Sequence, residues 1–177
     1  MDALSLKDLR VIQAQIGRSL RGKNDVAVRC SYGFPQVLKV HPLLEGKPFP
    51  TLYWLTCPFL SVRIDRLESV GAIPRLEESM RQEPGLMEAM RTAHHRYQAA
   101  RHAMLSPSEL DELRASGMLS ALSSRGIGGI SDLRGIKCLH LHAAHALVEE
   151  NPIGSIVLDL LQEQECPKKK VICSTLV

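Results

Sequence analysis

The segment KCLHLHAAH at positions 137–145 holds the densest group of potential metal ligands and nucleophiles in the chain. If it is helical, a rotation of about 100° per residue places Cys138, His142 and His145 on one face. The same rotation turns His140 to about 200°, on the opposite face. Imidazole and thiolate suit zinc or iron, so Cys138, His142 and His145 are predicted metal ligands.

Cys57 is the candidate for the fourth ligand. With it the site would be a closed centre of two cysteines and two histidines, and without it an open position could hold water and support catalysis. The sequence Thr-Cys-Pro also places Cys57 at a helix start, where amide donors favour the thiolate. Cys57 is then a reactive nucleophile or forms a redox pair with Cys138. The alternative is that Cys57 is a small buried residue and that the Cys and His side chains of 137–145 face the core or pair with carboxylates.

A glycine-rich turn, SRGIGGISD at positions 124–132, precedes this segment. Successive N–H groups before a helix can bind an anion, and Arg125 can add a phosphate contact. The predicted ligand-binding residues are therefore Arg125, Gly126, Gly128 and Gly129, with Lys137 one turn into the helix. The Walker spacing is absent. The alternative is a connection in which the glycines supply positive φ angles.

The longest predicted helix presents His94, Tyr97 and Arg101 on one face, by the rotation of about 100° per residue. Such a face lines a pocket, or is solvated, or makes structural hydrogen bonds. The sequence alone leaves these alternatives open.

The elements that must position these residues follow from hydrophobic spacing and from proline, glycine and serine signals. Three short β-branched and aromatic runs predict strands at 26–32, 36–42 and 51–56. Helices are predicted at 5–17, 58–70, 73–82, 84–105, 107–116, from Ser131 or Asp132 to about 150, and at 153–164. The predicted fold is α+β, with a small N-terminal antiparallel sheet of about three strands followed by a mostly helical majority.

The length of 177 residues predicts a single domain, 1–177. It divides into an N-terminal helix and connection (1–24), the sheet (25–56), the helical part (57–165) and a polar tail (166–177). The net charge of +3 and the 4% aromatic content argue against nucleic acid as a partner. The chain lacks an apolar run of about 18 residues, which argues against membrane insertion. Five cysteines without an export signal predict a reducing, cytoplasmic location.

Several motifs in this order resemble the bacterial family known as domain of unknown function 501. They are FPTLYWLTCPFL (49–60), HHRYQAAR (94–101), SRGIGGISD (124–132), KCLHLHAAH (137–145) and NPIG (151–154), and the resemblance covers about 25–160. The family has no established activity, and in some bacteria its genes lie near those for a septum-formation initiator and an exopolyphosphatase. The resemblance places emphasis on Cys57, on the glycine turn, and on Lys137, Cys138 and His140. It therefore adds Cys57, Cys138 and His140 as catalytic candidates.

Two functional hypotheses follow. The first is a metal- or thiol-dependent enzyme that uses Cys57, Cys138 and nearby histidines on a small anionic or phosphate-bearing ligand, with zinc or iron as the cofactor. The second is a non-catalytic module that binds a protein partner in cell envelope or division functions, with a structural Cys/His cluster.

Overall fold

The computed structural model describes residues 4–176, and its centre is a three-stranded antiparallel sheet with strand order β1-β2-β5. These strands are β1 (Asn24–Arg29), β2 (Pro35–Val40) and β5 (Tyr53–Leu55), which confirms the three predicted strands. A small hairpin of β3 (Leu43–Leu44) and β4 (Lys47–Pro48) lies between β2 and β5 in the chain and was not predicted.

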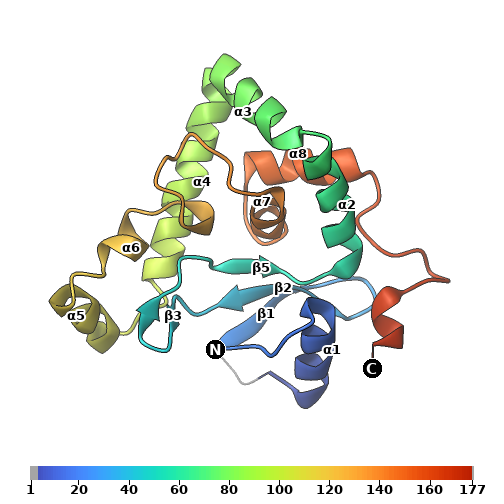
Figure 1. Cartoon of the computed structure of the whole chain (residues 1–177), viewed down its shortest axis with the longest axis horizontal. Helices are drawn as coiled ribbons and strands as arrows, with labels where there is room; N and C mark the ends of the chain where they lie inside the picture. Colours follow the sequence, from blue (N-terminus) through green and yellow to red (C-terminus); the bar gives the residue numbers. More distant parts are fainter. Residues whose placement is uncertain (1–3, 177) are drawn as a thin grey trace.

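One helix precedes the sheet and the helical majority follows it, which confirms the α+β fold (Figure 1). The helices are α1 (Leu6–Ile16), α2 (Pro58–Ser69), α3 (Ala72–Gln82), α4 (Pro84–His102), α5 (Pro107–Ala115), α6 (Ser120–Ser123), α7 (Leu139–Ala146) and α8 (Pro152–Leu161), with short 3₁₀ turns η1 (Ile127–Gly129) and η2 (Ile172–Thr175). Positions 1–3 and 177 of the first and last predicted segments lie outside the described residues. Within residues 4–176, none of the helices has the length and apolar character needed to span a bilayer.

The two faces of the sheet pack against different partners, because successive strand residues point to opposite sides. Val37 joins the main core with residues of α2, α3, α4, α7 and α8, whereas its neighbour Leu38 packs with Ile12 of α1. On the edge strand β5, Tyr53 belongs to the main core and Trp54 to the α1 side. Strand β5 therefore separates the helical majority from the α1 layer (Figure 1).

The predicted helix from Ser131 or Asp132 to about 150 is wrong at its start. The helix α7 begins only at Leu139, and Cys138 is its N-cap, with an extended backbone at φ −160° and ψ 153°. The Asp132 side chain accepts the N–H of Arg134 within a tight turn instead of opening a helix. Because Cys138 precedes the helix, the rotation that placed it on the face of His142 and His145 does not apply.

Candidate functional site

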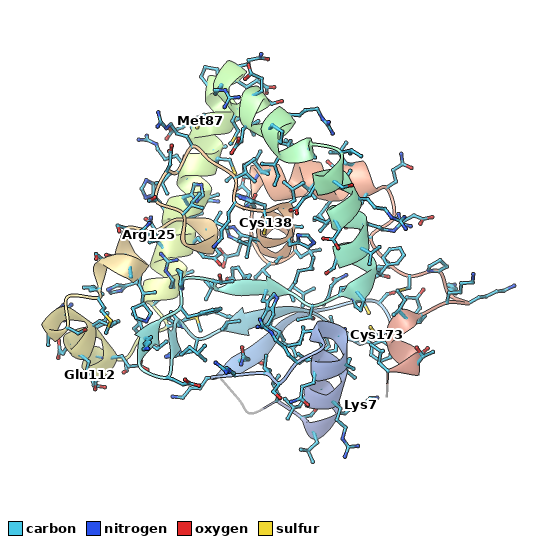
Figure 2. The ribbon with its side chains drawn as sticks, viewed as in Figure 1. Lys7, Met87, Glu112, Arg125, Cys138 and Cys173 are labelled. Carbon is cyan, nitrogen blue, oxygen red and sulfur yellow. The ribbon has the colours of Figure 1, made fainter. Side chains whose placement is uncertain are left out.

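Three potential metal-ligating side chains come together where the end of α2 meets the start of α7. One ligand atom from each of Glu68, Cys138 and His140 lies within 4.8 Å of the other two. All three side chains are half-buried. Figure 2 shows Cys138 near the middle of the molecule, at the start of α7. Thus the structure pairs Cys138 with His140, the histidine that the family resemblance stressed.

The two ring nitrogens of His140 have different partners. Nε2 lies 3.2 Å from the carbonyl oxygen of Ser61 and 3.3 Å from Asp65 Oδ1. A carbonyl oxygen only accepts, so Nε2 carries a proton and donates it. Nδ1 faces Glu68 Oε1 at 3.3 Å. Since a carboxylate also only accepts, a proton or a metal ion must lie between this oxygen and Nδ1.

The separation of 3.3 Å between His140 Nδ1 and Glu68 Oε1 suits a metal ion. In a tetrahedral zinc site with bonds of about 2.0–2.1 Å, neighbouring ligand atoms are about 3.3–3.4 Å apart. A histidine that binds a metal usually donates its other N–H to a carbonyl or carboxylate. Ser61 and Asp65 provide both acceptors on the opposite side of the ring.

Without a metal, His140 is protonated at neutral pH. Burial lowers its pKa, but the hydrogen bond with Cys138 and the charges of Glu68 and Cys138 outweigh burial and raise the pKa to about 9. Glu68 has a second role, because its Oε1 accepts the N–H of Leu139, the first residue of α7, at 2.5 Å. Glu68 thus stabilises the N-terminus of α7 from another helix.

Two members of the group, Cys138 and His140, line a cleft of about 560 Å³. Asp65, Arg18, Phe49 and Trp54 are among its other lining residues. Lys137 also lines the cleft, and its Nζ donates to the carbonyl oxygen of Gly128 at 3.0 Å. A volume of this size accommodates a small molecule.

Cys57 is the N-cap of α2 and is only 7% exposed. Burial raises the pKa of its thiol to about 11, although the N–H groups of Leu60 and Phe59 act in the opposite direction. The amide groups at the helix start therefore lower the pKa of the Cys57 thiol, as expected from the sequence, but desolvation raises it by more. Cys57 belongs to the main core, as its structural alternative predicts.

His142 and His145 are fully buried and are held by Asn151. The Asn151 Nδ2 group lies 3.3 Å from His142 Nδ1 and 3.0 Å from His145 Nδ1. The amide cannot be reversed, because Asn151 Oδ1 accepts the N–H of Gly154 at 2.7 Å. Both Nδ1 atoms therefore accept, so Nε2 carries the proton of each neutral ring and has no lone pair for a metal.

The four predicted metal ligands Cys57, Cys138, His142 and His145 do not form one ligand set. The physical reason is that Cys138 lies outside the helix, where it meets Glu68 of α2. The sequence contains no local signal for Glu68, because it lies 70 positions before Cys138.

The glycine turn is a packing element. The N–H of Ile127 donates to His94 Nδ1 at 3.1 Å, and the N–H groups of Gly126 and Gly129 bond to carbonyls within the turn at 2.9 and 3.0 Å. These three amides are not available to the predicted anion. The side chain of Arg125 is exposed, and Figure 2 shows it beside α6, away from Cys138.

A close approach explains each glycine of the turn. A Cβ at Gly128 would collide with Leu141, and one at Gly129 would lie 2.6 Å from Pro50 Cγ, with φ positive at both positions. The turn therefore uses glycine both for conformation and for space.

We expect Gly126→Ala to destabilise the fold by about 1–3 kcal/mol, because its Cβ would lie 2.7 Å from both His94 Nδ1 and Leu133 Cδ2. The measurement is urea unfolding. Gly85→Ala is the control, since that Cβ meets nothing within 4 Å and lies in a helix. Equal stability of the two variants would contradict the packing role.

The polar face of α4 points into the protein. His94, Tyr97 and Arg101 are all fully buried, so the structural alternative holds. The Tyr97 hydroxyl accepts the N–H groups of Leu52 and Tyr53 at 2.5 and 3.2 Å. This face connects α4 to strand β5.

A family model with the description "Protein of unknown function (DUF501)" matches residues 26–159, which confirms the resemblance seen in the motifs. Comparisons with curated proteins and with solved structures found no match.

Proposed function

Since this chain belongs to the DUF501 family, whose description names no activity, we propose a function from its site: a metal-dependent enzyme acting on a small anionic ligand. The proposed metal ligands are Glu68, Cys138 and His140, and the proposed metal is zinc or iron. The observation that carries the proposal is the convergence of these three ligand atoms within 4.8 Å, with Cys138 and His140 lining a cleft.

Three protein ligands beside a cleft are typical of a catalytic metal site, because a further position stays free for water or substrate. A metal in such a site supplies an activated water and polarises a bound oxygen. The chain itself orients the imidazole through Ser61 and Asp65 and holds the carboxylate through the N–H of Leu139. Arg18 and Lys137 add positive charge to the cleft, which favours an anionic ligand.

We expect about one zinc or ferrous ion per chain after anaerobic purification without a histidine tag. The measurement is metal content by mass spectrometry. Protein that has been incubated with zinc or iron is first desalted to remove unbound ions. Cys138→Ser, His140→Gln and Glu68→Gln should each lose the ion, since each removes one ligand.

Cys166→Ser and His95→Gln are matched controls, because neither residue belongs to the ligand group. Both controls should keep the ion. Metal-free wild-type protein after incubation with zinc and iron, or an ion retained by Cys138→Ser, would refute the metal site.

A thiol-dependent enzyme is the second candidate, favoured by the position of Cys138 at a helix N-terminus beside a histidine with a raised pKa. It predicts metal-free protein in which iodoacetamide modifies Cys138 before the other four cysteines. The non-catalytic module remains the outcome if Cys138 neither binds a metal nor reacts faster than Cys30 or Cys166.

A further inference from the structure

A second cavity of about 370 Å³ adjoins the cleft of the Cys138 group. Arg18, Phe49 and Trp54 line both spaces, so they form the boundary between them. The remaining walls of the second cavity include Arg21, from the connection after α1, and Asn24, the first residue of β1. The two spaces together run from α7 around strand β5 to the connection after α1.

The charges of the two spaces differ. The second cavity is lined by Arg18 and Arg21 and by no acidic residue. The cleft of the Cys138 group is lined by Arg18 and Lys137 but also by Asp65, and Glu68 lies next to it. An anionic group is therefore favoured at the two arginines, whose guanidinium groups bind phosphate through paired hydrogen bonds.

Apart from Ser19 and Asn24, the rest of the second cavity is apolar and aromatic. Val40, Leu44, Phe49 and Trp54 line it, and the guanidinium carbon of Arg18 lies 4.8 Å from the centre of the Trp54 ring. This stacking holds the Arg18 charge at the boundary of the two spaces. A ligand that fits these walls combines a flat apolar ring with an anion.

We propose that the second cavity binds a nucleoside monophosphate, with the phosphate at Arg18 and Arg21 and the base against Phe49 and Trp54. A phosphate without a ring leaves the aromatic wall uncovered, and a nucleoside without phosphate leaves the two arginines unpaired. The proposed binding is argued only from the residues that line this cavity and does not depend on a metal site. That the same molecule is the substrate at Glu68, Cys138 and His140 rests on the proposed function.

Trp54 is the single tryptophan of the chain, so its fluorescence reports directly on this boundary. We expect AMP to change Trp54 fluorescence in a saturable titration, with a Kd at least about tenfold below those of adenosine and of inorganic phosphate. Arg21→Gln should weaken AMP binding about tenfold, because it removes a charge-assisted phosphate contact. Arg10→Gln, an exposed arginine of α1 that lines neither space, should leave the Kd unchanged.

The Cys138→Ser variant separates this proposal from the metal site. Suppose that Cys138→Ser binds AMP with the wild-type Kd and that neither the wild-type protein nor any variant contains metal. The nucleotide cavity then stands, and the proposed metal-dependent enzyme fails. If the wild-type protein contains metal but AMP up to about 10 mM does not change Trp54 fluorescence, the nucleotide cavity is refuted and the metal site stands. Adenosine binding as tightly as AMP, or an unchanged AMP Kd in Arg21→Gln, would also refute the cavity.

Discussion

Arg101→Met should lower the free energy of unfolding by about 4 kcal/mol, because a buried side chain that serves several carbonyls is lost. The Arg101 guanidinium donates to the carbonyl oxygen of Pro50 at 2.8 Å and to those of Leu122 and Arg125. These acceptors belong to the segment before β5, to α6 and to the glycine turn. Without Arg101 they become buried and unpaired, and the turn loses its anchor on α4.

The measurement for Arg101→Met is urea unfolding monitored by circular dichroism. Arg96→Met is the matched control, since Arg96 is exposed on the same helix and pairs with Glu150 at the surface. That variant should change stability by less than about 1 kcal/mol. A similarly small change for Arg101→Met would show that the three carbonyl contacts contribute little.

Acidification from pH 7 to pH 5 should destabilise the protein strongly, because its buried histidines are neutral in the fold. Burial, and then the repulsion between the protonated forms of His94 and His145, lower the pKa of His94 to about 4. Burial, and then the repulsion between the protonated forms of His142 and His94, lower the pKa of His142 to about 3, while the hydrogen bond to Asn151 acts in the opposite direction. Burial also lowers the pKa of His145, against the attraction of Glu149.

The direction in which stability changes with pH follows from how many protons the folded and the unfolded chain bind. Between the ordinary histidine pKa of 6.5 and the lowered values near 4 and 3, the unfolded chain binds protons that the folded chain does not. Each such histidine gives a slope of about 1.4 kcal/mol per pH unit. The stabilisation is complete above about pH 6.5 and decreases as the pH falls, by about 4 kcal/mol for His94 and His142 together at pH 5.

Urea unfolding at a series of pH values tests this expectation. In His94→Gln the slope below pH 6.5 should decrease by about 1.4 kcal/mol per pH unit, even if the variant is less stable throughout. His95→Gln, an exposed neighbour, should keep the wild-type slope. A wild-type stability that does not change between pH 7 and pH 5 would contradict buried neutral histidines.

Local signals in the sequence account for most of the fold. Pro58, Pro84 and Pro107 each begin a helix, and Ser106 forms the N-cap of α5 with Glu109 completing a capping box. Such signals need only neighbouring residues, which is why these helices could be predicted.

The start of α7 could not be predicted in the same way. The N–H of Ile136 donates to Glu77 Oε1 at 2.9 Å, and that of Leu139 donates to Glu68. These acceptors are 59 and 71 positions away, so contacts with α2 and α3 keep the chain out of a helix up to Cys138. The local capping signal at Asp132 is overridden by these distant partners.

Distant contacts also explain why only part of the candidate site could be predicted. Cys138 and His140 could be named from their residue types and from the family motif, but their relation to each other depends on where α7 begins. A pattern of spacing cannot distinguish the half-buried His140 from the fully buried pair His142 and His145, which Asn151 at the start of the next helix holds. The third member of the proposed ligand group, Glu68, becomes a neighbour of Cys138 and His140 only after α2 and α7 dock.

The proposed ligand group joins distant parts of the chain, since Glu68 and Cys138 are 70 positions apart. An ion bound there would be a reversible cross-link around a loop of about seventy residues that includes α3, α4, α5 and α6. Closing a loop of that length restricts the unfolded chain, an effect worth about 4 kcal/mol in the chain-entropy treatment of disulfides. The supply of metal would then change the folding stability of the protein as well as its chemistry.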